Sequence, residues 1–479
     1  MKLEDKIDVF VWREHYADHI NPLWEAIPRE YRGNYYVSEH QVKKGKYKLP
    51  ESEDSIFVKN PYELIDVLTP SPRLMIVPTD RSGFLSLIPR PLARIAHGVA
   101  QTYKDEKIPD RNREQVILDL LPNEYSREKF SEKFPVSDKI VAGCPKMDRW
   151  CDFSKSLSEP PVVAISFHFN HKAVPETRGT YPHYQSILPK LAQSNEWELL
   201  GHGHPRFIDE LIPKYEELGI NYTRDFEEVM KQADVYACDN SSTLYEFAYT
   251  DRPVVVLNAP WFRREVEHGL RFWEHADVGI QCDKPEDLPG TIRKALKDEP
   301  PQPSLRRKAV NAAYAVTDGS ASETMAKKLV DFVKKAEVEE KLLISKQEEL
   351  PGFSELLNRA VNEGKINPPV WLAPQGLVTR HISKEREFLD FAIEGILDRD
   401  PRPVEGTEEM KLLKYQNIPG DLEGTVLITS DTWGEEIEEK LVDTGLTKGK
   451  IINFFDIFEE QKHQILLEIH QQKEINESV

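Results

Sequence analysis

Short apolar runs alternate with longer segments of helical periodicity along the first 150 or so residues. Runs at 7–12 and 73–78 are almost wholly apolar, which is typical of strands buried on both faces of a sheet. A third run at 139–142 leads into Gly143. This alternation predicts an α/β fold with a mainly parallel sheet, and we expect a first Rossmann-like lobe over residues 1–153.

The same alternation resumes after a polar, proline-bearing segment at 154–161, which indicates a linker. Helical segments separate the apolar runs here too, and one helix is expected to begin at Thr243. The expected strands are 162–167, 197–200, 234–238 and 253–258. We therefore expect a second Rossmann-like lobe over residues 160–335, with a cleft between the two lobes.

A third alternating region follows a helical, highly charged stretch at about 309–347. Strands are expected at 369–374, 425–430 and 450–455, and an amphipathic helix at 433–441. This pattern predicts a small C-terminal α/β appendage over residues 350–479. It contains no G-x-G-x-x-G motif, so dinucleotide binding is not supported there.

Composition narrows the class of protein. The 479 residues are 39% hydrophobic, which is enough for the cores of about two to four domains. A net charge of −19 disfavours general binding to nucleic acid or to anionic lipid. The sequence has no apolar stretch long enough for a membrane span and no metal-type cysteine spacing, and its first residues lead us to expect no signal peptide. We therefore expect a soluble, cytoplasmic protein with no transmembrane segment.

The strongest candidate for chemistry is the turn after the third expected strand of the second lobe, Asp239-Asn240-Ser241-Ser242. Serine hydroxyls and unpaired backbone N–H groups at the start of a helix can hold a phosphate. Glu246 lies one turn further on, where a carboxylate can accept hydrogen bonds from two ribose hydroxyls. The simpler alternative is that Asp239 or a serine merely caps the helix.

The stretch 233–260 resembles the donor-binding signature of the CDP-glycerol glycerophosphotransferase family, the teichoic-acid polymerases and primases. The matching residues are Asp239, Ser241, Ser242, Glu246, Arg252 and Pro253. The family usually has Asp where this chain has Glu246. Glu is typical of the related UDP-N-acetylglucosamine 2-epimerases and of many GT-B glycosyltransferases. The resemblance implies a GT-B-like fold and a nucleotide-diphosphate donor, and it leaves UDP-sugar and CDP-glycerol open.

Other landmarks of that family occur in the same order. His97-Gly98 resembles a His-Gly motif, which implies that His97 acts as the base on an acceptor hydroxyl. The segment 143–148 resembles the Gly-x-Pro-x-x-Asp motif before the interlobe linker. His204-Pro205 resembles the His-Pro loop, which implies that His204 meets the phosphates of the donor. Taken alone, His97 could be an ordinary surface or core histidine before a glycine turn.

Cationic side chains near these landmarks could neutralise a leaving phosphate. They are Arg206, Arg263, Arg264, His268 and Arg271. Arginine binds a diphosphate bidentately, although such residues could equally form a solvated face. His202 and His204 are two residues apart, but no acidic or cysteine partner lies nearby in sequence, so we expect no metal site.

Together these residues predict a transferase that moves a sugar or glycerol-phosphate group from a nucleotide-diphosphate donor to a hydroxyl acceptor. We expect inversion at a sugar, no metal and no tightly bound cofactor. A glycan, polyol, protein or modified base remains open as acceptor, and a homo-oligomer remains open as assembly. One alternative is a UDP-N-acetylglucosamine 2-epimerase-like enzyme, with Asp80 and Asp105 as candidate carboxylates. The other is a non-catalytic nucleotide- or glycan-binding scaffold.

Overall fold

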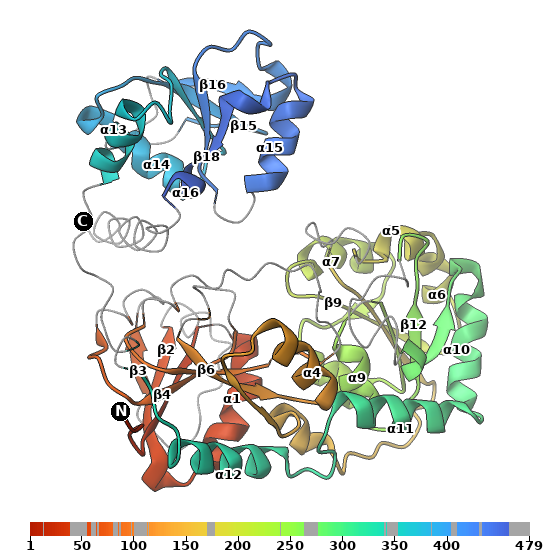
Figure 1. Ribbon diagram of the computed structural model, residues 1–479. Helices are drawn as coiled ribbons and strands as arrows, with labels where there is room; N and C mark the ends of the chain where they lie inside the picture. The colour runs from red at the N-terminus through yellow and green to blue at the C-terminus, as the bar shows by residue number, and fades with distance from the viewer. Residues whose placement is uncertain are drawn as a thin grey trace. The chain divides into compact units, whose positions relative to one another are not determined.

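The computed structural model contains three separate parallel β-sheets (Figure 1). It describes residues 1–12, 14–38, 55–58, 64, 67–79, 85, 88–96, 98–99, 113, 115–169, 178–239, 241–262, 276–339, 342, 353–384, 386–403, 410–430 and 434–458. The chain forms two compact units, and the larger consists of residues 1–60, 71–82 and 90–343. Residues 61–70, 83–89 and 344–479 form the smaller unit.

The first lobe of the larger unit is a seven-stranded parallel sheet in the order β3-β2-β1-β4-β5-β6-β7. Its central strands are buried on both faces, as their unbroken apolar runs predict. Its strands are β1 (Ile7–Val11), β2 (Arg32–Ser38), β3 (Ser55–Val58), β4 (Leu74–Val77), β5 (Leu92–Ile95), β6 (Val116–Leu121) and β7 (Asp138–Val141). Its described helices are α1 (Glu14–Ala26), η1 (Arg29–Tyr31), α4 (Glu124–Lys133) and η4 (Pro145–Trp150).

The second lobe is a six-stranded parallel sheet in the order β10-β9-β8-β11-β12-β13. Its strands are β8 (Val162–Phe167), β9 (Glu198–Gly203), β10 (Asn221–Tyr222), β11 (Val235–Cys238), β12 (Val254–Leu257) and β13 (Ile280–Cys282). The strand order reverses between β8 and β11. Ligands of open parallel sheets bind outside the carboxyl ends of the strands at such a reversal.

Helices cover both faces of this second sheet, and its hydrophobic clusters lie beneath them. They are α5 (Tyr181–Tyr184), η6 (Gln185–Ile187), α6 (Leu188–Ala192), α7 (Ile208–Glu217), α8 (Phe226–Gln232), α9 (Thr243–Ala248), η7 (Ala276–Val278), η8 (Pro285–Asp287), α10 (Leu288–Lys297) and α11 (Gln302–Ala313). The strand β11 and the helix α9 flank the predicted Ser-Ser turn, as the sequence predicts.

After the second lobe the chain returns to the first. Helix α12 (Ala321–Val333) packs against α1, η4 and β7 of the first lobe. Beyond it, the N–H of Val338 donates to the carbonyl of Met1 at 2.8 Å. The expected continuous helical stretch from 309 is therefore wrong in part, because residues 314–320 break it and Gly319 adopts a φ of +81°.

The smaller unit contains a five-stranded parallel sheet in the order β16-β15-β14-β17-β18. Its strands are β14 (Val370–Ala373), β15 (Ile393–Asp398), β16 (Lys411–Lys414), β17 (Thr425–Ile428) and β18 (Ile451–Asn453). Its helices are α13 (Phe353–Asn362), α14 (Leu377–Lys384), η10 (Arg386–Phe388), η11 (Tyr415–Asn417), α15 (Gly434–Asp443), η12 (Lys448–Lys450) and α16 (Phe454–Ile457). Hydrophobic clusters lie on both faces of the sheet. The predicted α/β fold class is confirmed.

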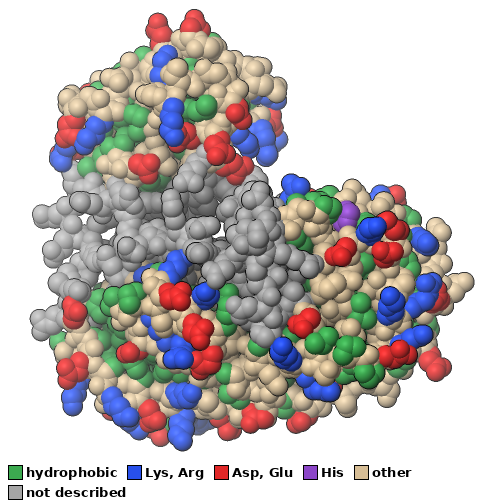
Figure 2. Space-filling model, turned by 45° about the vertical axis from the view of Figure 1, so that its right-hand side comes forward, with side chains coloured by type: hydrophobic (Ala, Val, Ile, Leu, Met, Phe, Trp, Pro, Cys, Tyr) green, Lys and Arg blue, Asp and Glu red, His purple; other side chains and the backbone are tan. Residues whose placement is uncertain are grey.

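The described surface is charged but mixed in sign. Figure 2 shows acidic and basic side chains interspersed over the face it presents. Among the described residues, no helix is both long enough and apolar enough to cross a bilayer.

Candidate functional site

Three loops meet the carboxyl edge of the second sheet where the strand order reverses. His168 follows β8, His204 follows β9 and Asp239 follows β11. Because these strands are neighbours and parallel, their carboxyl ends lie side by side. The topology therefore brings the predicted Asp239 turn and the predicted His204 loop to one edge.

The carboxylate of Asp239 fastens two of these loops together. Its Oδ1 accepts a hydrogen bond from the N–H of His168 at 2.9 Å. Its Oδ2 accepts from the N–H of Thr180 at 2.8 Å and from the Thr180 hydroxyl at 3.1 Å. The side chain is fully buried. These bonds give Asp239 a positioning role at the loop after β8, and its direct contact with a donor stays a prediction.

The two serines of the turn behave differently from each other. The Oγ of Ser241 accepts from the backbone N–H of Thr243 at 3.3 Å and from its hydroxyl at 2.8 Å. These two bonds are local contacts within the turn, because Ser241 precedes Ser242, the N-cap residue of α9. Ser242 occupies the N-cap position of α9, yet its hydroxyl makes no capping bond. Ser242 is half-buried, so part of its side chain remains accessible.

Gly98 brings the first lobe against this turn. A Cβ atom placed on Gly98 would lie 2.9 Å from Oγ of Ser242. Only a residue without a side chain leaves that space open without displacing the hydroxyl. Gly98 follows β5, so the carboxyl edge of the first sheet reaches the carboxyl edge of the second at this point.

Glu246 forms an ion pair with the first lobe. Its Oε2 lies 2.7 Å from Nζ of Lys146, and the two side chains are only 8% and 14% exposed. Lys146 belongs to the segment 143–148, which also joins the lobes in another way. The carboxylate of Asp148 accepts from the N–H groups of Ala321 at 3.0 Å and Ser322 at 2.7 Å, and so caps α12.

His204 is half-buried at the end of β9 and packs against two neighbouring rings. Its ring centroid lies 4.7 Å from that of His168 and 4.6 Å from that of Phe169. Its Nδ1 accepts from the N–H of Arg206 at 3.1 Å, so a neutral ring carries its proton on Nε2. The guanidinium of Arg206 lies 5.2 Å from the centre of the Phe169 ring. Burial lowers the pKa of His168, which favours its neutral form.

His202 does not share the environment of His204. It is buried, and its Nδ1 lies 2.8 Å from Oγ of Ser166. Burial lowers its pKa to about 4. His202 is therefore a core histidine. Within the described part of the chain, no three His, Cys, Asp or Glu side chains are grouped to hold a metal ion.

Several predicted residues lie outside the described residues. They are His97, Asn240, Arg263, Arg264, His268 and Arg271, together with Asp80 and Asp105 of the epimerase alternative. Their roles stay predictions.

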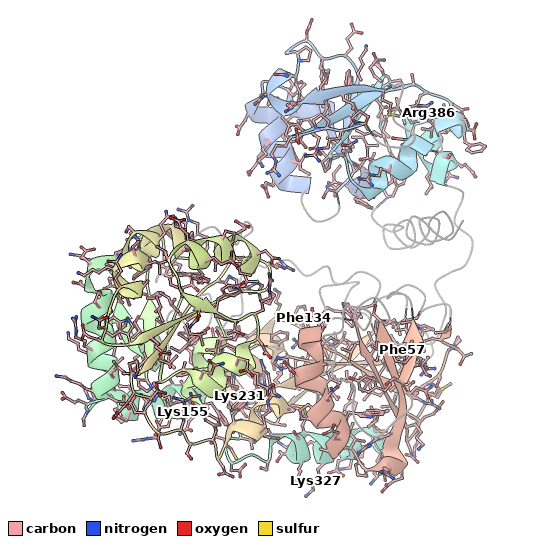
Figure 3. The ribbon with its side chains drawn as sticks, turned by 180° about the vertical axis from the view of Figure 1, so that it is seen from behind. Phe57, Phe134, Lys155, Lys231, Lys327 and Arg386 are labelled. Atoms are coloured by element: carbon pink, nitrogen blue, oxygen red, sulfur yellow. The ribbon has the colours of Figure 1, made fainter. Side chains whose placement is uncertain are left out.

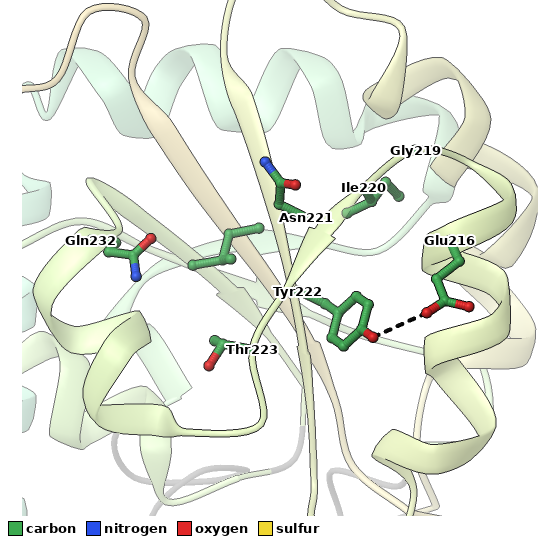
Figure 4. Close-up of a pocket in the computed structure, with 8 residues that line it drawn as sticks. Glu216, Gly219, Ile220, Asn221, Tyr222, Thr223 and Gln232 are labelled. Carbon is green, nitrogen blue, oxygen red and sulfur yellow. Dashed lines mark hydrogen bonds between the residues drawn. The ribbon is translucent and has the colours of Figure 1, made fainter.

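A surface depression of about 570 Å³ lies elsewhere, beside the edge strand β10. Figure 4 shows its lining, with the Tyr222 hydroxyl donating to Glu216. It contains none of the predicted site residues. Its position at a sheet edge, away from the carboxyl ends of β8 and β11, separates it from the candidate site.

Sequence reasoning missed two contributors to the site. Thr180 holds Asp239 from a loop that no motif marks. Lys146 was part of a recognised segment, but nothing in its spacing indicates a partner 100 residues away. No local signal identifies such a pair, because only the fold brings the two residues together.

Two parallel-sheet lobes that meet at their carboxyl edges define a protein of the GT-B type. Solved structures share this fold. The wall teichoic acid polymerase TagF matches with a TM-score of 0.50 at 14% identity, over 70% of this chain and 90% of TagF. A TagF variant soaked with CDPG gives 0.51 at the same identity and coverage. A putative UDP-N-acetylglucosamine 2-epimerase from Listeria monocytogenes gives only 0.46, at 13% identity over 70% and 98% of the two chains.

The particular family is indicated by the second lobe. The model of the family described as CDP-Glycerol:Poly(glycerophosphate) glycerophosphotransferase matches residues 190–331. The chain thus resembles that family, as its motifs predict. No curated protein sequence matches the chain. Together the family match and the shared fold support a nucleotide-donor transferase.

Proposed function

We propose that the chain transfers a glycerol-phosphate or sugar group from a nucleotide-diphosphate donor to a hydroxyl acceptor, without a metal or a tightly bound cofactor. One observation carries the proposal. Gly98 contacts Ser242, which brings the residue after His97 to the Ser-Ser turn. The residue that follows the predicted base and the predicted phosphate-binding turn come from different lobes, and their closeness supports the proposal.

In the proposed reaction, His97 removes the proton from the acceptor hydroxyl as its oxygen attacks the donor. If the donor is CDP-glycerol, the oxygen attacks the phosphorus that carries glycerol, the P–O–P bond breaks and CMP leaves. If the donor is a UDP-sugar, the oxygen attacks the anomeric carbon, its configuration inverts and UDP leaves. His204, Arg206, Ser241 and Ser242 hold the phosphates, and a cation from residues 263–271 neutralises the leaving group.

The leaving nucleotide separates the two forms of the proposal. The purified chain is incubated with CDP-glycerol or a panel of UDP-sugars and candidate hydroxyl acceptors, and released CMP and UDP are quantified. We expect one nucleotide, released faster with acceptor present, and a loss of at least about a hundredfold in His97→Ala. A chain that binds CDP or UDP but turns over no donor would instead be a binding scaffold. Release of UDP from UDP-N-acetylglucosamine without acceptor would favour the epimerase alternative.

A further inference from the structure

Lys146 contacts the carboxylate of Glu246, which the sequence predicts to hold the ribose of the donor. Its ammonium lies 2.7 Å from Oε2 of Glu246, in the first turn of α9. Lys146 comes from η4, which belongs to the first lobe. The donor site thus contains a charged side chain that the second lobe does not supply.

Adhesion between the lobes does not require this ion pair. Met147 and Trp150, also of η4, already lie in one hydrophobic cluster with Leu244 and Phe247 of α9. Burying an ammonium and a carboxylate costs desolvation that their attraction often fails to repay. A buried pair beside an apolar contact therefore calls for another role.

Other charged side chains surround the ammonium of Lys146. Asp18 on α1 and Glu246 both raise the pKa of Lys146, although burial opposes them. Burial also raises the pKa of Asp18, which is consistent with a water-poor surrounding. Arg149 and Glu227, which are paired at 3.1 Å, act electrostatically on the same Asp18. Lys146 thus stays charged beside Glu246.

We propose that Lys146 is a positioning residue for the nucleotide's ribose. It holds Oε2 of Glu246 and leaves Oε1 to accept hydrogen bonds from the two ribose hydroxyls, since a carboxylate accepts about four such bonds. This inference rests on the proposed function. Binding of the ribose then depends on the first lobe, because Lys146, which orients the Glu246 carboxylate, comes from that lobe.

Calorimetry with two kinds of ligand tests the role. CDP and UDP, and their 2′,3′-dideoxy forms, are titrated into the wild-type chain, Lys146→Met and Lys146→Arg. We expect Lys146→Met to weaken the affinity for the ribose-containing nucleotides about tenfold or more, because a charge-assisted hydrogen bond is lost. The affinity for the dideoxy nucleotides should change less than about twofold. Lys146→Arg should restore most of the ribose-dependent affinity.

Lys155→Met provides a matched control. Lys155 also pairs with a buried carboxylate, Asp234, and their side chains are 17% and 4% exposed. That pair lies at the amino end of the second sheet, where Asp234 also accepts from the N–H of Val162 (Lys155 is marked in Figure 3). We expect Lys155→Met to leave the affinity for both ligand forms within about twofold of wild type.

Three results would overturn the inference. If Lys146→Met weakened the binding of both ligand forms equally, the Lys146–Glu246 pair would have only a structural role. If it left binding unchanged, Lys146 would not contribute to the nucleotide site. If the wild-type chain binds neither nucleotide, the proposed function itself fails, and the inference with it. Should Lys146→Met not fold, Glu246→Gln serves instead. It must show the same ribose-selective loss, and an equal loss for both forms would count against the inference.

Discussion

At position 98 the chain has no side chain, and the hydroxyl of Ser242 lies only 2.9 Å from the place that a Cβ atom would take. At position 239 the opposite holds, since one carboxylate accepts three hydrogen bonds and leaves little freedom to the loops around it. Two single residues thus shape the candidate site: Gly98 of the first lobe leaves room for the Ser242 hydroxyl, and Asp239 of the second lobe holds the neighbouring loop by hydrogen bonds.

Gly98→Ala should impair activity far more than folding. The added methyl group would force the Ser242 hydroxyl into another rotamer, at a cost of about 1 kcal/mol, and away from the proposed phosphate position. We expect kcat/KM to fall roughly tenfold while Tm changes by about two degrees or less. In a Ser242→Ala background the steric part of the effect should vanish. Equal losses in both backgrounds would refute the steric explanation.

Mild acid should destabilise the chain through His202. Burial lowers its pKa to about 4, against an ordinary value of 6.5. The unfolded chain therefore binds the proton more readily, so the stability contributed by the neutral ring is complete above about pH 6.5 and is lost as pH falls toward 4. The full loss corresponds to roughly 3 kcal/mol. Urea unfolding at pH 7.5 and pH 5 measures the part of this loss that occurs above pH 5, about 2 kcal/mol, and His202→Gln should flatten the dependence. An unchanged dependence would place the titrating group elsewhere.

Among the elements, the strand ends and helix starts carry the site. The turn between β11 and α9 holds the serines, and η4 brings Lys146 to α9 while capping α12 through Asp148. Neither α9 nor η4 is longer than six residues. Short elements that end at a site fix its geometry by their caps and contacts more than by their own stability.

Asp148→Ala should loosen α12. It leaves the N–H groups of Ala321 and Ser322 without their carboxylate acceptor, which costs about 1–2 kcal/mol of unfolding free energy. Asp318→Ala is the control, because Asp318 bonds Ser320 in the same loop but is exposed, and we expect it to leave the unfolding free energy nearly unchanged. Urea denaturation compares the two variants. Equal losses would show that capping of α12 is not the cause.

Strands such as β4, β8 and β12 could be predicted from the sequence because each is almost wholly buried and is composed almost entirely of apolar residues. The run at 162–167 matches β8 residue for residue. The two-residue strand β10 could not be predicted, because both of its residues are exposed and only its pairing with β9 defines it. The break at 314–320 had a local signal in Gly319, which a reading for charge and helical periodicity overlooked.

In the candidate site too, features set by local sequence could be predicted, and contacts between the lobes could not. The Ser-Ser turn was predictable, because a strand, a polar turn and a helix follow one another directly, from Val235 to Ala248. The contacts of Gly98 with Ser242 and of Lys146 with Glu246 were not. Each joins the two lobes, and such pairs depend on how whole sheets pack rather than on any local pattern.

At the scale of the whole molecule, the chain comprises two compact units, and the candidate site lies wholly within the larger. The smaller unit has its own hydrophobic clusters on both faces of its sheet. Units with separate cores can unfold independently, so a ligand of one need not stabilise the other.

A nucleotide should therefore stabilise one unit alone. In scanning calorimetry we expect two transitions, and CDP or UDP at about 100 times its Kd should add about 2.7 kcal/mol to only one of them. Leu427→Ala, in the buried strand β17, identifies the other transition by lowering it, with a cost of about 2–5 kcal/mol. A nucleotide shift in the transition that Leu427→Ala lowers would contradict the assignment of the site.

The return of the chain to its first lobe also bears on how the protein is made. The helix that covers α1 and β7 is α12, which is followed by the contact between Met1 and Val338. A ribosome delivers the first sheet long before it delivers that cover. The nascent first lobe therefore lacks this cover until the entire second lobe has emerged, and apolar surface exposed during synthesis is what chaperones protect from aggregation.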